Sequence, residues 1–85
     1  MEIEIYVKLF ASLRKYSPPQ SCNGSFSIKI PAGTEVHQML EFLSLPRELS
    51  KIVLRNGCHA NLKEEVVNND TISVFPPLAG GIYRV

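Results

Sequence analysis

Residues 2–9 read Glu-Ile-Glu-Ile-Tyr-Val-Lys-Leu, with aliphatic side chains at every second position. A period of two is typical of a β-strand with one buried face, because successive side chains point to opposite sides of a sheet. The stretch therefore predicts a half-buried strand at the start of the chain. Its expected buried face is made by Ile3, Ile5, Val7 and Leu9. Its expected open face is made by Glu2, Glu4, Tyr6 and Lys8.

The hydrophobic period changes after this strand. Apolar side chains then follow helical spacing, which predicts a short helix ended by Ser17-Pro18-Pro19, because proline disfavours the helical conformation in the residue before it. The apolar positions of this helix are Leu9, Phe10, Leu13 and Tyr16. Residues 22–25 predict a turn, since Asn and Gly both accept positive φ. Residues 26–30 alternate again and predict a second strand that pairs with the first.

The principal helix is expected to follow Pro31-Ala32-Gly33. Thr34 is a good N-cap, and Glu35 in the first turn suits the positive end of the helix dipole. An apolar stripe with helical spacing comes next, and Pro46 lies just beyond the expected end. The stripe is made by Val36, Met39, Leu40 and Leu43.

The remaining segments complete an α+β pattern. A short strand at 52–54 leads into an Asn56-Gly57 turn, and a loop and a second turn precede a strand at 71–75. The predicted order is β-α-β-α-β-β, which fits a mixed sheet covered by one main helix. We expect the last strand to lie beside the first, in the centre of the sheet.

Composition excludes several functional classes. The 85 residues carry nine Lys and Arg against eight Asp and Glu, with no basic block, which argues against a nucleic-acid-binding surface. No apolar run approaches the ~20 residues of a membrane span, and the N-terminus is acidic where a secretory signal is basic. Two cysteines are too few for a disulfide scaffold, so we expect a protein of the reducing cytoplasm.

Candidate catalytic and metal-binding groups are sparse. Cys58-His59 has no second Cys or His at zinc-like spacing, and His37 and Cys22 are far away in sequence, so no metal site is expected. We expect His37 to be exposed on the main helix, residues 64–65 to be solvated, and Asp70 to stabilise a turn. No Gly-rich phosphate-binding loop is present, so we expect no cofactor, and any ATP must be bound by a partner.

Residues 75–81 read Phe-Pro-Pro-Leu-Ala-Gly-Gly. Prolines end strand pairing because they lack a backbone donor, so we expect a domain at 1–76 and a flexible diglycine tail at 77–85. Extended at ~3.3 Å per residue, residues 76–81 would span roughly 20 Å and fit a narrow channel on another protein. From the Gly-Gly dipeptide alone, a simple flexible terminus is the alternative.

Five segments, which together cover nearly the whole chain, follow one another in an order typical of a known family. They are Val7–Arg14, Ile30–Val36, Asn56-Gly57, Asn69–Pro77 and Leu78–Gly81. Together they resemble the MoaD/ThiS family of prokaryotic ubiquitin-like sulfur carriers, which have the β-grasp fold. The helix directly after the first strand is more similar to the MoaD branch, the small subunit of molybdopterin synthase.

The resemblance implies a carrier that is not itself an enzyme. A ubiquitin-activating-like adenylating enzyme would use ATP to adenylate the carboxylate of Gly81, and sulfur transfer would then give a thiocarboxylate. The large subunit of molybdopterin synthase would receive the sulfur for molybdopterin. Gly80 and Gly81 suit this chemistry, because a Cβ would obstruct the partner's pocket. The residues expected to dock partners, beside the exposed sheet face, are Phe75, Pro76, Leu78 and Ala79.

Four residues, Ile82-Tyr83-Arg84-Val85, follow the glycine at which a typical mature carrier ends. Either a processing protease removes them and frees the Gly81 carboxylate, or the chain is a ubiquitin-like interaction module that carries no sulfur. A sulfur carrier for thiamine synthesis or tRNA thiolation is a further alternative with the same fold and tail.

Overall fold

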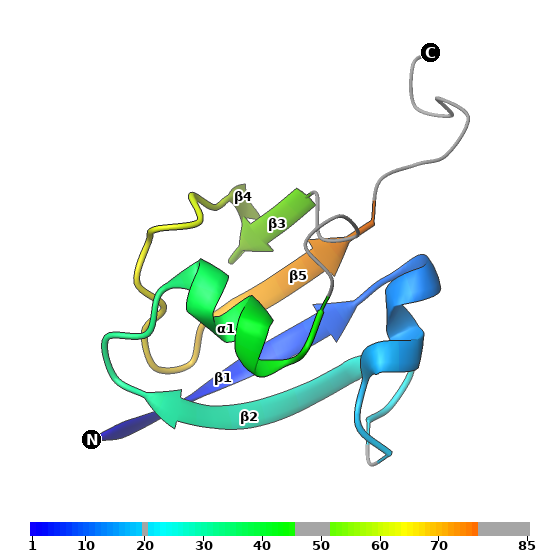
Figure 1. Cartoon of the computed structure of the whole chain (residues 1–85), viewed down its shortest axis with the longest axis horizontal. Helices are drawn as coiled ribbons and strands as arrows, with labels where there is room; N and C mark the ends of the chain where they lie inside the picture. Colours follow the sequence, from blue (N-terminus) through cyan, green and yellow to red (C-terminus); the bar gives the residue numbers. More distant parts are fainter. Residues whose placement is uncertain (20, 46–51, 77–85) are drawn as a thin grey trace.

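A five-stranded sheet carries one α-helix on one of its faces (Figure 1). The computed structural model describes residues 1–19, 21–45 and 52–76. The strands are β1 (Glu2–Leu9), β2 (Ser25–Pro31), β3 (Ile52–Arg55), β4 (Cys58–His59) and β5 (Thr71–Phe75). The helices are the 3-10 helix η1 (Ala11–Tyr16) and the α-helix α1 (Val36–Phe42). The predicted α+β architecture, with one main helix over the sheet, is confirmed.

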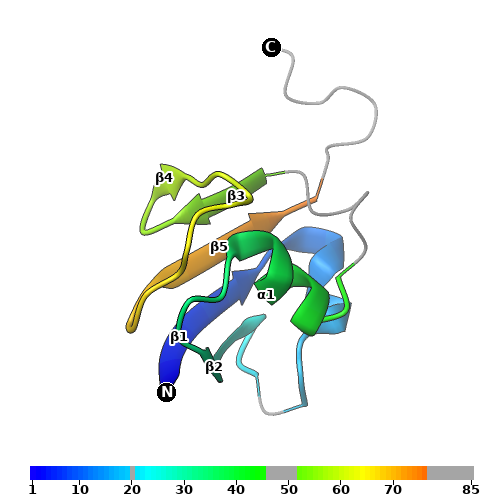
Figure 2. The same ribbon diagram turned by 60° about the vertical axis from the view of Figure 1, so that its left-hand side comes forward.

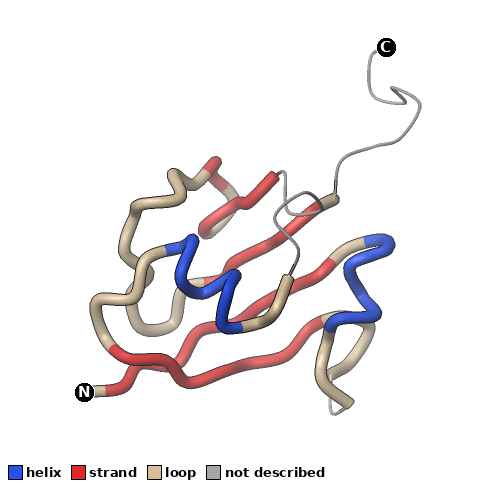
Figure 3. The backbone as a smooth tube through the Cα atoms, in the orientation of Figure 1, coloured by secondary structure: helices blue, strands red, loops and turns tan. Residues whose placement is uncertain are grey.

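The sheet is mixed, and its two terminal strands lie side by side. Its order is β2-β1-β5-β3-β4, with β1 parallel to β5 and the other pairs antiparallel. The prediction that the last strand lies beside the first is therefore confirmed, as Figure 3 shows for the course of the backbone. Because the last strand, β5, lies between β1 and β3, the chain after it starts from the middle of the sheet.

The hydrophobic core lies on the face of the sheet that α1 covers, and Figure 2 shows the helix over this face. The alternation predicted for β1 is confirmed: its odd positions from residue 5 onward are at most 1% exposed, and Ile3 is half-buried. Burying such a side chain contributes about 1.5–3 kcal/mol relative to leaving it exposed. The core comprises Ile5, Val7, Leu9, Leu13, Phe26, Ile30, Val36, Met39, Leu40, Leu45, Val53, Val66, Ile72 and Val74.

The start of α1 differs from the prediction. Glu35, and not Thr34, is the N-cap, and it forms a capping box with Gln38. The Gln38 side chain accepts a hydrogen bond from the Glu35 amide at 2.9 Å. Thr34 instead donates its hydroxyl proton to the Pro31 carbonyl at 2.6 Å, which closes the turn before the helix. The first amides of a helix have no hydrogen-bond partner within it, and the side chain of either Thr34 or Glu35 can accept from one of them. The sequence alone therefore did not decide between the two residues as N-cap.

Two local elements also depart from the sequence pattern. The first helix is short, as predicted, but has 3-10 geometry. Residues 58–59, for which no strand was predicted, form β4, because Leu54 and Arg55 pair with His59 and Cys58 across the predicted Asn56-Gly57 turn. A two-residue strand is too short to show a period of two, so the alternation rule missed it.

The two predicted tight turns are confirmed by their backbone angles. Asn56 and Gly57 have φ of 54° and 87°, and Asn23 and Gly24 have φ of 53° and 83°. Pairs of positive φ suit two-residue hairpin turns, which match the twist of the strands on either side. A Cβ on Gly24 would lie 2.4 Å from the Leu9 carbonyl oxygen, so this position also requires glycine for space.

Candidate docking face

The tail begins where the central strand β5 ends. The last residue of β5, Phe75, pairs with Ile52, and Pro76 is buried. The Phe75 ring stacks on the Phe10 ring, with centroids 4.3 Å apart and planes 12° apart. The Phe10 amide donates to the Val74 carbonyl at 3.1 Å, which fixes the chain after β1 beside the end of β5. The base of the tail is thus held by two segments that are far apart in sequence.

Only two of the residues predicted to act at the tail belong to the part of the chain that the structure describes. Phe75 and Pro76 lie at the end of β5, and their role in docking stays a prediction. Leu78, Ala79, Gly80 and Gly81 lie outside the described residues. Phe10 was assigned only to a helical stripe, because its contact with Phe75 is made across 65 positions of sequence and no local period reports it.

The face of the sheet opposite α1, which we call the open face, is organised in three rows across the strands. Each row joins side chains that the strand register or a ring stack places opposite one another. The apolar row is made by Phe10, Phe75 and Ile52. The lysine row is made by Ser25, Lys8, Ser73 and Leu54. The tyrosine row is made by Ser27, Tyr6 and Thr71.

The open face is partly hollowed between the lysine and tyrosine rows. The hollow has a volume of about 420 Å³. Its lining residues are Tyr6, Val7, Lys8, Ser25, Phe26, Ser27 and Thr71. Tyr6 is 42% exposed, and Lys8 and Ser27 are also exposed, so the hollow is accessible from solvent. The open face therefore combines an apolar strip beside the tail base with a shallow depression one step further along the strands.

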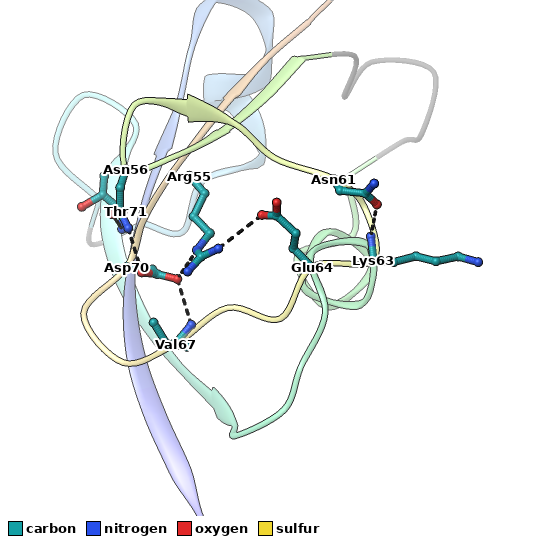
Figure 4. A network of polar contacts seen from close by, with 8 residues as sticks. All are labelled: Arg55, Asn56, Asn61, Lys63, Glu64, Val67, Asp70 and Thr71. Carbon is teal, nitrogen blue, oxygen red and sulfur yellow. Dashed lines mark hydrogen bonds and ion pairs between the residues drawn. The ribbon is translucent and has the colours of Figure 1, made fainter.

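The opposite end of β5 is fixed by a polar network (Figure 4). Asp70 is 3% exposed and accepts hydrogen bonds from Arg55 Nε at 2.8 Å, Asn56 Nδ2 at 2.9 Å and the Val67 amide at 2.8 Å. The Thr71 amide donates to Asn56 Oδ1 at 2.9 Å. The prediction that Asp70 stabilises a turn is confirmed, and the network extends this role to the join between β3 and β5.

The charges in this network support one another. Burial of the Asp70 carboxylate opposes its ionisation, but the hydrogen bonds from Val67, Asn56 and Arg55, with the positive charge of Arg55, outweigh burial and lower the pKa of Asp70. The hydrogen bond to Asp70 and its negative charge likewise raise the pKa of Arg55, against desolvation. Both groups are therefore ionised at neutral pH.

Two expectations about surface charges need correction. Glu64 was expected to be solvated, but it accepts a bond from Arg55 Nη1 at 3.3 Å. His37 was expected to be exposed, but its side chain is only 30% exposed, and its Nε2 lies 2.7 Å from Glu35 Oε1. Arg55 was not singled out from the sequence, because its partners come from the turn before β5 and from the loop before that turn. A basic residue ahead of an Asn-Gly turn is a weak signal by itself.

The other candidate groups remain separate from one another. Cys22 and Cys58 are both exposed and free. Within the described ranges, no three His, Cys, Asp or Glu side chains are grouped so that they could hold a metal ion. None of the helices in the described part of the chain has the length and apolar character needed to cross a membrane.

Comparison with known proteins gave one family match and several matches in fold. The family model described as the ThiS family matches residues 7–81. Small archaeal modifier protein 1 of Haloferax volcanii matches with a TM-score of 0.69 and 24% identity, over 92% of this chain and 99% of that one. A protein described as molybdopterin converting factor subunit 1 of Pyrococcus furiosus has a TM-score of 0.71 and 22% identity, over 89% and 99%.

A third structure, the HVO 2177 protein of Haloferax volcanii, has a TM-score of 0.76 and 24% identity, over 94% of this chain and 88% of that one. No curated protein matched the chain in the corresponding search. At these identities the structural matches establish the fold, and the β-grasp, ubiquitin-like architecture is confirmed.

Proposed function

This chain belongs to the ThiS family, and from that premise we propose that it carries sulfur as a thiocarboxylate on Gly81. Members of this family are small carriers and not catalysts, so the chemistry takes place on partner proteins. The family match ends at residue 81, so it includes Gly80-Gly81 and excludes the four residues that follow. Gly81 is the expected reactive end of the mature carrier.

The observation that supports this proposal best is the construction of the tail base. β5 lies in the centre of the sheet and ends at Phe75 and Pro76, where the stack with Phe10 holds it. A tail anchored there extends from a rigid point, and the apolar row lies next to it. A partner that binds the apolar row would therefore receive the tail in a defined place, which is what chemistry on a chain end requires.

The reaction needs two steps on the tail. An adenylating partner, which binds the ATP, joins the Gly81 carboxylate to AMP and releases pyrophosphate. Hydrosulfide then attacks the acyl carbon and forms the C–S bond, AMP leaves with the electron pair of the broken C–O bond, and the Gly81 thiocarboxylate remains once the thioacid has lost its proton. No side chain of this chain takes part as a base or a nucleophile, and no cofactor bound by this chain is required.

The residues after Gly81 must be removed before the first step, because a glycine within a peptide bond has no carboxylate to adenylate. We propose that a protease cleaves after Gly81. For the second partner, the segment η1 directly after β1 favours the large subunit of a molybdopterin synthase over the alternatives of thiamine synthesis and tRNA thiolation.

The four residues after Gly81 also favour a second function. If Ile82–Val85 stay attached, the open face would serve a ubiquitin-like interaction module that carries no sulfur. The two functions place the same surface against a partner and differ only in whether the tail reacts.

The test uses three proteins: the full chain, the chain ending at Gly81, and a matched control ending at Ala79. Each is incubated with ATP and the ubiquitin-activating-like adenylating enzyme encoded in the same genome, and pyrophosphate release is measured. Release with the Gly81 form alone supports the carrier. Release with none of the three would contradict it and favour the interaction module. Equal release with the Ala79 form would show that the diglycine is not the reactive end.

A further inference from the structure

The chain contains two Asn-Gly pairs, Asn23-Gly24 and Asn56-Gly57, and each forms the two-residue turn of a hairpin. The φ angles are 53° and 83° in the first turn and 54° and 87° in the second. The residues that flank each pair lie opposite one another across the hairpin. Because the backbone of the two turns is so similar, a difference in reactivity between the two asparagines must come from their surroundings.

An Asn-Gly pair is open to deamidation, because glycine has no side chain to hinder attack by its own backbone nitrogen. That nitrogen gives its proton to solvent and attacks Cγ of the asparagine. A C–N bond forms, the Cγ–Nδ2 bond breaks, and Nδ2 takes a proton from solvent and leaves as ammonia. Water then opens the resulting succinimide ring at one of its two carbonyl carbons. Opening at the side-chain carbonyl gives Asp, and opening at the backbone carbonyl gives isoaspartate, in which the main chain runs through Cβ and Cγ.

The side chain of Asn56 is held at both of its polar atoms (Figure 4). Its Nδ2 donates to Asp70 Oδ1 at 2.9 Å, and its Oδ1 accepts from the Thr71 amide at 2.9 Å. Attack by Gly57 requires the side-chain amide to leave both partners, so these hydrogen bonds oppose the reaction. The negative charge of Asp70 also lies beside a nitrogen that must itself become negative, and like charges disfavour this.

The surroundings of Asn23 are the opposite in both respects. Asn23 is exposed, and its side chain makes no hydrogen bond among the described residues, whereas those of Asn56, Asn61 and Asn68 all do. The nearby charge is positive, since the Arg14 side chain runs past the turn, with its Cγ 3.2 Å from the position of a Cβ on Gly24. None of the ion pairs in the described part of the chain includes Arg14. A positive charge beside the Gly24 nitrogen favours the anion that attacks.

Burial of the glycine acts in the other direction. Gly24 is buried and its carbonyl accepts from the Leu9 amide at 2.9 Å, whereas Gly57 is exposed. Opening the first turn therefore breaks this backbone hydrogen bond. Opening the second breaks the two side-chain bonds of Asn56 and a bond of 2.8 Å from its amide to the Thr71 carbonyl. One of these three bonds goes to a carboxylate, and bonds to charged groups are stronger than those between neutral groups, so the balance favours reaction at Asn23.

We propose that Asn23 is a site of spontaneous covalent modification, where the folded protein is converted to Asp and isoaspartate, and that the polar network around Asp70 protects Asn56 from the same reaction. Isoaspartate adds one carbon to the backbone of a two-residue turn, so Cys22 and Ser25 lose the register that their hydrogen bonds require. Either product adds a carboxylate beside Arg14. The modification therefore changes the start of β2 and leaves the join between β3 and β5 intact. It does not depend on whether the protein carries sulfur.

The test follows both pairs in the full chain during storage in mildly alkaline buffer, which favours loss of the glycine amide proton. Trypsin places Asn23 in the peptide of residues 16–29 and Asn56 in that of residues 56–63. Chromatography and mass spectrometry then measure Asp and isoaspartate at each position. In the folded protein, we expect Asn23 to react at least about tenfold faster than Asn56. In concentrated urea, the two rates should agree within about twofold, because the dipeptide is the same and the surroundings are lost.

Two variants separate the causes. Asp70→Ala should raise the rate at Asn56 by about tenfold and leave that at Asn23 unchanged, because it removes the acceptor and the negative charge beside Asn56 alone. Arg14→Gln should slow Asn23 by about threefold, while the matched control Lys29→Gln, on an exposed position of β2, should not. Thermal unfolding of each variant shows that the rates are those of the folded protein.

Four outcomes would overturn the proposal. They are equal rates at the two pairs in the folded protein, a faster reaction at Asn56, no reaction at Asn23 while the chain in urea reacts, and an equal rise at both pairs in Asp70→Ala. The last would show that opening of the whole domain, and not the network around Asp70, governs the reaction. If Asp70→Ala does not fold, the ratio of the two rates in the parent and the effect of Arg14→Gln still decide the matter.

Discussion

The two faces of the sheet differ in composition and in exposure to solvent, although they are made by alternate residues of the same strands. The face under α1 is almost wholly aliphatic, and its central side chains are at most 1% exposed. The open face mixes aromatic, hydroxyl and charged side chains in three rows, most of them half-buried or exposed. The first face holds the domain together, and no helix or strand of the described residues covers the second. A single alternating sequence thus separates buried from accessible side chains by the direction of each side chain.

The largest expected difference between the faces is in stability. Ile72→Ala, on the covered face, should lower the free energy of unfolding by about 3 kcal/mol, because it removes buried methyl groups and leaves a cavity. Leu54→Ala, on the open face of the neighbouring strand β3, should lower it by about 1 kcal/mol or less. Urea denaturation of both variants measures the difference. Equal losses would show that the open face also carries the fold.

The polar network at the start of β5 should rank second. Asp70→Ala leaves Arg55 and two further donors without their acceptor, and should lower the free energy of unfolding by about 2 kcal/mol. Lys63→Ala, on the exposed loop nearby, is the matched control and should change it little. Urea denaturation followed by circular dichroism provides both values. A loss for Asp70→Ala no greater than that for Lys63→Ala would show that the network is incidental.

The stack at the tail base should affect binding more than stability. Phe75→Ala removes a half-buried ring and its stack with Phe10, for an expected loss of about 1 kcal/mol in unfolding free energy. The same change should raise the KM for adenylation of the chain ending at Gly81 by about tenfold, since it removes an aromatic side chain at the centre of the apolar row. Pyrophosphate release and urea denaturation are measured on the same protein. A variant that loses stability while keeping its KM would assign Phe75 to the core alone.

The smallest effect concerns the pH dependence of stability, which the buried Asp70 should govern. The pKa of Asp70 is lowered from its ordinary value of 3.8 by its partners, so its contribution to stability is complete above that value and is lost as the pH falls through the lower pKa of the folded state. Unfolding free energy should therefore fall with pH in this acid range, and Asp70→Asn should flatten the slope. Urea titrations at several acid pH values measure it. An unchanged slope would mean that other carboxylates govern the acid response.

The sequence predicted the strands and the main helix well where a single period ran for several residues. β1 and β2 were identified by alternation, and α1 by its apolar stripe, because burial on one face imposes these repeats directly. The errors fall where a choice depended on neighbours that are distant in sequence. The N-cap is Glu35 where Thr34 was predicted. The short strand β4 was not predicted, because it depends on pairing with β3.

The candidate site was predicted less completely than the fold. Phe75 and Pro76 were named, but Phe10 was taken for a helix position and Arg55 was not considered. Both act through contacts with segments far away in the chain, Phe10 through Phe75 and Arg55 through Asp70. Lys8 was assigned to the polar face of its strand, and only the register with β2 and β5 shows that it lies between Ser25 and Ser73.

By itself, the sequence determined which side chains of each strand would be buried, and it placed a diglycine at residues 80–81, four residues beyond the last strand. Those features are local, because alternation and turn preferences depend on residues a few positions apart. Only the tertiary structure decided which residues the other side chains contact. The parallel pairing of β1 with β5 places the Phe10 ring against the Phe75 ring. Pairing of β1 with both β2 and β5 places Lys8 between Ser25 and Ser73. Strand pairing is a contact between distant segments, and the energy that selects it comes from burying the opposite face. The arrangement of side chains on the open face is therefore a consequence of how the core is packed.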